Sequence, residues 1–377
     1  MTFRRQASGD HRVGPSVRAA LGFLCLLGVV ADSVRGQCEA AKLLPGDAQA
    51  GQRFGSAVAL SEDIVVVGAS DDDEGGEEAG AAYVFRRQGL MWIEEAKLLA
   101  SDGEDHDWFG SATAVDGLIA VIGAWGDDDA YPGHETCNSG AAYVFRYTAG
   151  IWVEEAKLLA PEPAWGDHLG YAVAVHGDVA VLGAPCDSDN GPVAGAAYIY
   201  RCDGRAWSCE ATLLAPYGNA YDYFGASVAV FGNAVVIGCR GDDDQGMDTG
   251  SVFVFRYEGS TWVQQAKLSA SDAEACDEFG ASVAVAGDLL AAGARWNDVH
   301  GPGSGSAYVF RFEDEQWQEE ARLLASDGAS EDQFGYTVAT NGQAVAVGAY
   351  RDDDHGADSG SVYLFGSSEE FVGEDEG

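Results

Sequence analysis

The sequence predicts an all-β fold, a β-propeller of six four-stranded blades whose ring is closed by the N-terminal strand. Three observations predict it. A unit of about 55 residues recurs six times, each unit contains four short β-type runs, and the two chain ends together complete the last unit. The runs are rich in β-branched and aromatic residues and show no helical periodicity. A seven-bladed ring is the alternative.

Each repeat begins with Phe-Gly or Leu-Gly followed by an alternating apolar run. These pairs start at Phe54, Phe109, Leu169, Phe224, Phe279 and Phe334, in steps of 55, 60, 55, 55 and 55 residues. The four runs of the best-formed unit are Phe224-Gly-Ala-Ser-Val-Ala-Val, Ala234-Val-Val-Ile-Gly, Gly250-Ser-Val-Phe-Val-Phe-Arg and Trp262-Val-Gln-Gln-Ala-Lys-Leu. Continuously apolar second runs such as Ile64-Val-Val-Val suit strands that neighbouring blades cover on both faces.

The chain ends predict how the ring closes. The sixth unit stops at Phe365 without a fourth strand. Near the N-terminus, Cys38-Glu-Ala-Ala-Lys-Leu-Leu44 matches the fourth strands that contain Glu95 and Glu155. We therefore expect the N-terminal strand to complete the last blade, which leaves no open sheet edge. The propeller is expected to span residues 37–366 and to precede a disordered acidic tail, 367–377.

Residues 1–36 have the features of a secretory signal peptide. Four arginines precede the mostly apolar segment 19–31, which small residues follow. This segment is too short to span a bilayer, and no longer apolar segment follows it. We expect cleavage after Ala31 or Gly36 and a secreted, extracellular protein without membrane insertion.

The composition combines a globular core with a large negative charge. Apolar residues make up 47% of the chain, and 61 Asp and Glu outnumber 21 Lys and Arg, which gives a net charge of −40. Such a charge repels nucleic acids and anionic membranes, so neither is an expected partner. Cations are favoured instead.

Cysteines are the second feature typical of secreted chains. Removal of residues 1–36 leaves seven of the eight cysteines. Cys202 and Cys209 flank a predicted turn between two strands, close enough for a disulfide. Two ordinary buried thiols are the alternative.

The repeats resemble the FG-GAP repeats of integrin α-subunit propellers. Phe-Gly opens the first strand, and Gly-Ala-Pro or a variant ends the second: Gly68-Ala-Ser, Gly123-Ala-Trp, Gly183-Ala-Pro, Gly238-Cys-Arg, Gly293-Ala-Arg and Gly348-Ala-Tyr. The resemblance spans residues 38–366 and implies an integrin-like propeller of the kind used in cell adhesion. Family propellers usually have seven blades, and their calcium loop joins the first and second strands. Here that connection is a tight turn such as Val175-His-Gly-Asp178, so no integrin calcium residue can be carried over.

Acidic residues instead fill the loop between the second and third strands. Counted from the glycine that ends the second strand, they recur at +4, +6 and +10, around a glycine at +8. The candidate ligands are Asp242, Asp244 and Asp248 in blade four, Asp352, Asp354 and Asp358 in blade six, Asp187 and Asp189 in blade three, and Asp72, Glu74 and Glu78 in blade one. Such spacing around a glycine bend suits calcium, which takes six to eight oxygen ligands. The alternative is a solvated turn in which Asp caps backbone amides.

A second acidic loop lies on the same face, between each fourth strand and the next blade. An Asp precedes the Phe or Leu of the repeat by two residues in five blades: Asp107, Asp167, Asp222, Asp277 and Asp332. We expect these side chains to accept hydrogen bonds from the backbone entering the first strand. Direct metal ligation is the alternative.

Aromatic residues of this face provide a candidate ligand site. Trp108 and Trp165 stand beside the first strands and suit contacts with a protein or a sugar ring, although packing between adjacent loops is the alternative. The chain has no nucleophile elbow and no histidines with metal-ligand spacing. We expect a secreted, calcium-binding module for an extracellular protein or glycan rather than an enzyme. A glycoside-processing enzyme and a structural wall or matrix protein are the alternatives.

Overall fold

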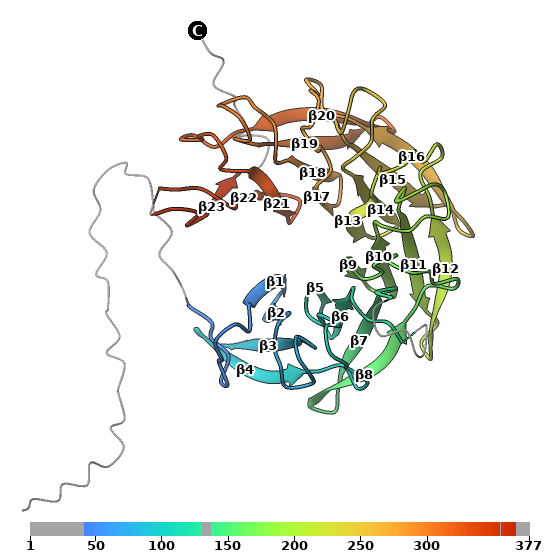
Figure 1. Cartoon of the computed structure of the whole chain (residues 1–377), viewed down its shortest axis with the longest axis vertical. Coiled ribbons are helices and arrows are strands. Elements are labelled where there is room, and N and C mark those ends of the chain that lie inside the picture. Colours follow the sequence, from blue (N-terminus) through green and yellow to red (C-terminus); the bar gives the residue numbers. More distant parts are fainter. Residues whose placement is uncertain (1–40, 130–136, 355, 367–377) are drawn as a thin grey trace, which may run out of the picture. The chain divides into compact units, whose positions relative to one another are not determined.

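The computed structural model describes residues 41–129, 137–354 and 356–366. All regular elements in these residues are β-strands, which form six antiparallel sheets arranged as the blades of a ring (Figure 1). The predicted six-bladed, all-β propeller is therefore confirmed. The expected signal peptide, 1–36, and the expected acidic tail, 367–377, lie outside the described residues. The described part of the chain contains no helix that could serve as a membrane span.

The strands of a blade follow one another from the centre of the ring outward (Figure 1). The first strands are β1 (Phe54–Ser61), β5 (Ala112–Asp116), β9 (Ala172–His176), β13 (Phe224–Phe231), β17 (Ser282–Ala286) and β21 (Phe334–Thr340). The second strands are β2 (Ile64–Ala69), β6 (Ile119–Ala124), β10 (Val179–Ala184), β14 (Ala234–Cys239), β18 (Leu289–Ala294) and β22 (Val345–Ala349). The third strands are β3 (Ala81–Gln88), β7 (Ala141–Thr148), β11 (Ala196–Cys202), β15 (Ser251–Tyr257), β19 (Ser306–Glu313) and β23 (Ser361–Phe365). The fourth strands are β4 (Met91–Leu98), β8 (Ile151–Leu158), β12 (Trp207–Leu213), β16 (Trp262–Leu268) and β20 (Gln316–Leu323).

The hydrophobic cores lie between neighbouring blades. Five clusters of buried side chains each combine residues of two successive blades. The second strands are covered on both sides, so that every residue of β2, β10, β14 and β18 is buried. This explains their continuous apolar sequences. The blades are therefore stabilised by each other rather than by separate cores.

A backbone contact between blades explains the glycine that precedes each third strand. At five junctions this glycine forms a parallel bridge with the Phe or Leu of the next repeat, as Gly250 does with Phe279. Gly250 has a φ of +80°, and a Cβ there would lie 2.1 Å from the carbonyl oxygen of Phe279. Only glycine allows both the left-handed backbone and the close approach.

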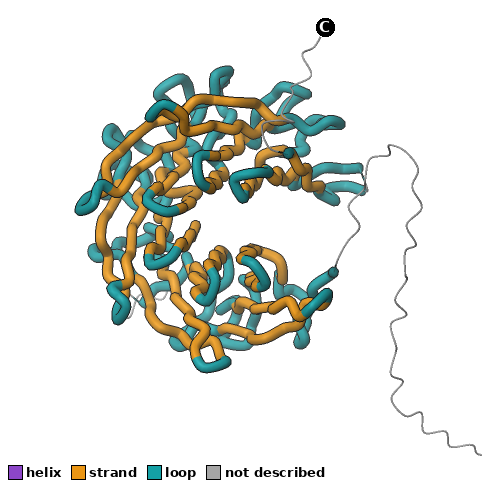
Figure 2. Tube along the Cα trace, turned by 180° about the vertical axis from the view of Figure 1, so that it is seen from behind, coloured by secondary structure: helices purple, strands orange, loops and turns teal. Residues whose placement is uncertain are grey.

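The sixth junction differs from the other five. Gly360 and Phe54 hold the corresponding positions but form no such bridge. In Figures 1 and 2, β1 and β23 do not lie side by side as the neighbouring strands of other blades do. Val58 of β1 and Leu364 of β23 are 63% and 56% exposed, although apolar residues at these positions are buried in blades four and five. In the described residues the sixth sheet has three strands, and residues 41–44 form no strand. The predicted closing strand is thus not seen there, and residues 38–40 of it lie outside the described residues.

The segment after residue 42 nevertheless takes the place of a loop from a preceding blade. Leu43 packs against the buried residues of blade one. The Gly46 amide donates a hydrogen bond to Glu94 Oε2 at 2.7 Å, and the Tyr83 hydroxyl donates one to Asp47 Oδ1 at 2.7 Å. The corresponding two contacts recur at the start of blade two. The residues just after the predicted closing strand therefore follow the repeat pattern.

The expected disulfide between Cys202 and Cys209 is not formed, and both residues are free thiols. In the β11–β12 pair, Cys202 lies opposite Trp207 and Cys209 lies opposite Tyr200. The two cysteines are therefore diagonal neighbours, which in a sheet are about 7–8 Å apart and beyond the usual reach of a disulfide. The hairpin was predicted correctly, but its register was not known from the sequence.

Candidate functional site

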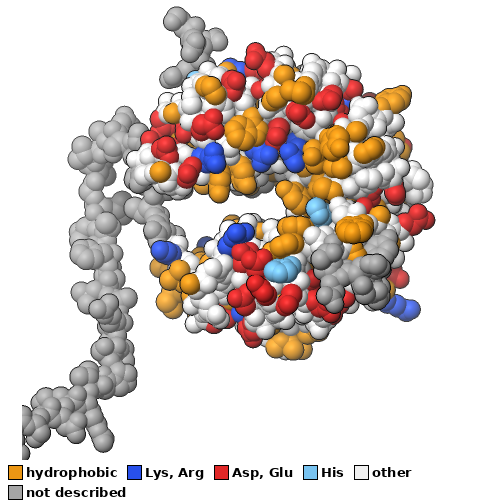
Figure 3. Space-filling model, in the orientation of Figure 1, with side chains coloured by type: hydrophobic (Ala, Val, Ile, Leu, Met, Phe, Trp, Pro, Cys, Tyr) orange, Lys and Arg blue, Asp and Glu red, His pale blue; other side chains and the backbone are white. Residues whose placement is uncertain are grey.

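The two acidic loops of each blade lie together on one side of the ring, called here the loop face. Backbone hydrogen bonds join them, as from the Phe109 amide to the Ala79 carbonyl, 2.9 Å. In Figure 3, acidic side chains are spread over the face shown, and basic side chains gather along the inner margin of the ring. The functional candidates from the sequence all fall on these loops.

The acid at +4 of the loop between second and third strands, called here the inner acid, is buried in every blade that has it. The inner acids are Asp72, Asp127, Asp187, Asp242 and Asp352, and Asn297 takes the place in blade five. Each accepts the backbone N–H two residues further on, as Asp242 Oδ1 does from Asp244 at 3.0 Å. In blades one, two, three and six a tyrosine of the third strand also donates to the inner acid, as the Tyr198 hydroxyl does to Asp187 Oδ2 at 2.6 Å. The residue at +4 therefore caps a backbone amide of its own loop.

A lysine of the fourth strand pairs with the inner acid in blades one, two and four. Lys157 Nζ lies 2.8 Å from Asp127 Oδ2, 3.0 Å from Asp102 Oδ2 and 2.5 Å from Asp129 Oδ2. Lys97 in blade one contacts Asp72 and Glu74, and Lys267 in blade four contacts Asp242 and Asp244. In blades one and four the ammonium group thus contacts carboxylates that the sequence analysis gave as candidate calcium ligands.

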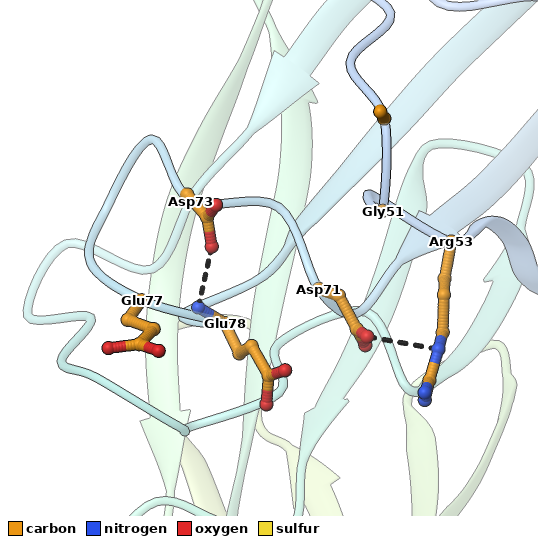
Figure 4. Close-up of a pocket in the computed structure, with 7 residues that line it drawn as sticks. Gly51, Arg53, Asp71, Asp73, Glu77 and Glu78 are labelled. Carbon is orange, nitrogen blue, oxygen red and sulfur yellow. Dashed lines mark hydrogen bonds and ion pairs between the residues drawn. The ribbon is translucent and has the colours of Figure 1, made fainter.

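The +10 residues do not converge with the other carboxylates. Glu78, Asp248 and Asp358 have positive φ angles of 54°, 51° and 51°, and their amides donate to the Asp at +5. Figure 4 shows the Asp73 carboxylate on the Glu78 amide, with the Glu78 side chain extending away. No loop of the described residues brings its three acidic positions together as a metal site. The +10 residues therefore serve the turn, and calcium binding by these loops stays a prediction.

Blade three has the acids without the lysine. Thr212 of β12 stands at the position of Lys157 and Lys267. No basic side chain of the described residues pairs with Asp187 or Asp189 in the ion pairs found. The pKa of Asp189 is raised, first by the negative charge of Asp187 and then by burial. This loop keeps an uncompensated negative charge, with carboxylate oxygens that suit calcium.

The acids two residues before the repeat Phe or Leu, called here the junction acids, are buried beside the inner acids. As expected, each accepts a backbone hydrogen bond, for example Asp107 Oδ2 from the Glu104 amide at 2.8 Å. In two blades an amide replaces one member of the pair and donates to the other. Gln52 donates to Asp72, and Asn297 Nδ2 donates to Asp277 Oδ2 at 3.0 Å. The remaining four blades place two carboxyl groups in this position.

The paired carboxyl groups have perturbed acidity. The pKa of Asp107 is raised to about 7, mainly by burial and in part by the negative charge of the neighbouring Asp127. Burial likewise raises the pKa of Asp167 and of Asp222 to about 6, with the inner acid of each blade contributing. A buried acid beside another acid is therefore held toward its protonated form, which can donate a hydrogen bond.

Six consecutive matches to the FG-GAP repeat cover residues 38–85, 92–145, 152–200, 207–255, 262–310 and 317–365. The chain belongs to the FG-GAP repeat family. The last five matched units each run from a fourth strand through the next three strands, and the first unit starts at residue 38, within the predicted closing strand. The FG-GAP propeller thereby resembles the N-terminal domain of integrin α-subunits, as expected. No curated protein gave a significant match to the whole sequence.

On the loop face of this FG-GAP propeller, aromatic rings of blades two and three form a continuous stack. The Trp108 and Trp125 rings are stacked with centroids 4.3 Å apart, and His168 meets Trp125 edge-on at 4.9 Å. His106 lies 5.8 Å from Trp108, whose indole N–H donates to Glu78 Oε2 at 3.1 Å. A shallow pocket beside this stack is lined by Glu78, His106 and Trp108 among others. Trp108 is therefore partly packed, whereas Trp165 is 76% exposed.

Charged and aromatic side chains continue around the face in blades four to six. The Arg240 guanidinium lies 4.3 Å from the centroid of Tyr223. Glu278 accepts from Arg240 at 3.5 Å and from Arg295 at 2.7 Å, and Arg295 covers Tyr336. These contacts link successive blades and place flat, partly exposed side chains along the ring.

The sequence interpretation missed the lysine of the fourth strand, although the signal was present. Lys97, Lys157 and Lys267 precede the last leucine of their strands by one residue, and Thr212 breaks the series. The period-two alternation of a strand directs these positions toward the adjacent loop. An alignment of the six repeats by their fourth strands would have distinguished blade three from the others.

Proposed function

We propose that the chain is a secreted ligand-binding module that holds an extracellular protein or glycan on its loop face. The observation that carries the proposal is the stack of Trp108, Trp125 and His168, next to carboxylates of the acidic loops. Flat aromatic faces bury the apolar side of a sugar ring or a protein side chain, and flanking carboxylates accept hydrogen bonds from hydroxyl groups. FG-GAP propellers provide a rigid ring that positions such loops.

Secretion is part of the proposal and is supported by the sequence of residues 1–36. Arginines followed by a short apolar segment and small residues are typical of a cleaved signal peptide. The large negative charge is compatible with an extracellular medium rich in calcium, which would screen the repulsion between the acidic loops.

Calcium binding is proposed for the acidic loop of blade three. Asp187 and Asp189 offer hard oxygen ligands, Glu162 contributes to the same negative field, and Thr212 provides no competing ammonium group. Calcium accepts carboxylates, carbonyl groups and water in a flexible geometry, so a loop with few fixed ligands suits it. Blades one, two and four are not proposed as calcium sites, because lysines hold their carboxylates.

A binding role is favoured over glycoside hydrolysis by the burial of the perturbed acids. Asp107, Asp167 and Asp222 have raised pKa values, which a general acid requires. Their exposed fractions are 4%, 2% and 1%, so they do not face an opening for a substrate. Their hydrogen bonds to backbone amides serve the loop instead.

The proposal is tested by binding to an array of glycans and extracellular matrix proteins in calcium buffer. We expect a ligand whose affinity falls about tenfold or more in the variants Trp108→Ala and Trp125→Ala, since each removes a stacking surface. Trp165→Ala tests whether the exposed loop of blade three extends the same surface.

Tyr217→Ala serves as the control, because Tyr217 is 88% exposed but lies outside the stack. Thermal unfolding of each variant separates lost binding from lost folding. A ligand that the wild type, Trp108→Ala and Trp125→Ala bind equally well would contradict the assigned surface.

A further inference from the structure

Blade four departs from the other blades at positions that meet in one place. Cys239 ends β14 where each of the other second strands ends in alanine. Phe253 of β15 stands where the other third strands carry a tyrosine, namely Tyr83, Tyr143, Tyr198, Tyr308 and Tyr363. These tyrosine hydroxyls donate to acids of the loop face, so blade four lacks a hydrogen-bond donor there and gains a thiol.

The thiol lies between the junction acid and the inner acid of the same blade. One ligand atom from each of Asp222, Cys239 and Asp242 lies within 4.8 Å of the other two. Their exposed fractions are 1%, 0% and 3%. In the described part of the chain, no other group of three His, Cys, Asp or Glu side chains meets this criterion.

Asp222 has a carboxylate oxygen without a partner at this point. Its Oδ2 accepts the Asn219 amide at 2.7 Å, but the buried Oδ1 accepts no hydrogen bond. No other carboxylate of the described residues has such a buried, unpartnered oxygen. In blades one and five the side-chain amides of Gln52 and Asn297 join the two positions by a hydrogen bond. In blade four no side-chain amide joins the two positions, and two carboxyl groups and a thiol meet there instead.

We propose that Asp222, Cys239 and Asp242 form a binding site for a divalent transition-metal ion of the Zn²⁺ class. A thiolate is a soft ligand that suits zinc and cobalt and does not suit calcium or magnesium. Zinc bonds of about 2.0–2.3 Å in a tetrahedron place ligand atoms about 3.5 Å apart, so a small contraction of the cluster is sufficient. Three protein ligands leave the fourth position of the tetrahedron for water.

Metal binding must replace two contacts that Cys239 and Asp242 make in this structure. The Cys239 Sγ–H donates to the backbone carbonyl of Asp222 at 3.3 Å, and this proton passes to solvent when the sulfur binds the metal. Lys267 Nζ lies 2.6 Å from Asp242 Oδ2 and 2.5 Å from Asp244 Oδ2, so it keeps the exposed Asp244 when Asp242 turns to the ion. The three carboxylates, the thiolate, the ammonium group and the dication then sum to a charge of −1.

The test uses Co²⁺ as the probe on the full chain under reducing conditions. We expect one tightly bound Co²⁺ per chain with a near-ultraviolet thiolate-to-cobalt absorption band, and displacement of this band by Zn²⁺. Cys239→Ala is expected to abolish the band and to weaken cobalt binding about tenfold or more. Asp222→Asn is expected to weaken binding while the thiol remains.

The controls separate this site from other thiols and from calcium. Cys239→Ala installs the residue found in the other five blades, so it should fold, and its thermal unfolding verifies this. Cys209→Ala, which removes a thiol elsewhere in the described chain, should retain the band. A band that persists in Cys239→Ala, or no stoichiometric cobalt binding by the wild type, overturns the proposal. Neither outcome affects the calcium site of blade three, which contains no cysteine among its proposed ligands.

Discussion

Replacing Asp107 by Asn should raise the free energy of unfolding at pH 8 by about 2–4 kcal/mol. Burial and the neighbouring Asp127 raise the pKa of Asp107 to about 7, so at pH 8 the wild type must hold two buried negative charges in one place. An asparagine removes one of them. It can also donate to Asp127 as Asn297 donates to Asp277 in blade five.

The same shift fixes the pH dependence. A carboxyl group whose pKa is higher in the folded state binds a proton more tightly there, so folding gains stability when the group is protonated. For Asp107 this contribution is complete below about pH 4 and is lost as the pH rises through about 7. Asp167 and Asp222, with pKa values raised to about 6, add losses in the same direction between about pH 4 and 6.

Urea unfolding of wild type and Asp107→Asn at pH 5 and pH 8 measures both effects. The gain from the substitution should be larger at pH 8 than at pH 5. Glu313→Gln, which removes a carboxylate from an exposed position at the end of β19, serves as the charge-matched control. Equal stability of Asp107→Asn and wild type at pH 8 would show that Asp107 is ionised without cost.

Lys157→Met should lower the free energy of unfolding by about 3–5 kcal/mol. The ammonium group lies within 3.0 Å of three carboxylates, and the side chain of Asp127 is only 1% exposed. Its removal leaves a buried charge without a partner. Calcium should recover part of the loss, because the substituted loop then resembles that of blade three.

A double variant separates this electrostatic effect from lost packing. Asp127→Asn in the Lys157→Met background should recover much of the stability, since it removes the unpaired charge. Arg205→Met removes a positive charge from an exposed turn and should have little effect. If Lys157→Met and Arg205→Met were equally stable in urea titrations, the lysine would not be the cation of its loop.

The repeat period carried most of the information about the fold. The strict spacing of the Phe-Gly pairs predicted six blades, and the apolar runs that begin at Ile64 and Ala234 lie in buried second strands. Closure of the ring depends on contacts between residues far apart in the sequence, which no local pattern specifies. The register that separates Cys202 from Cys209 is set by the turn between β11 and β12, whose geometry the sequence did not specify.

The sequence predicted on which loops the candidate site lies, but it did not predict which side chains contact each other there. The sequence predicted the loop face and the spacing of Asp242 and Asp244. It did not predict their partner Lys267, which comes from another strand. Whether a carboxylate binds calcium or a lysine is decided by such neighbours. The proximity of Asp222 to Cys239 could not be predicted from the sequence, because only the folded blade brings these two residues together.

We propose that each acidic loop requires a cation and that blade three takes calcium because Thr212 replaces the lysine. Thermal unfolding of the chain in chelator, and then across a calcium titration with magnesium as control, tests this most directly. We expect calcium to raise the midpoint selectively in the wild type and to have little effect in Thr212→Lys, which supplies the missing ammonium group. A midpoint that calcium leaves unchanged in the wild type, or raises equally in Thr212→Lys, would contradict it.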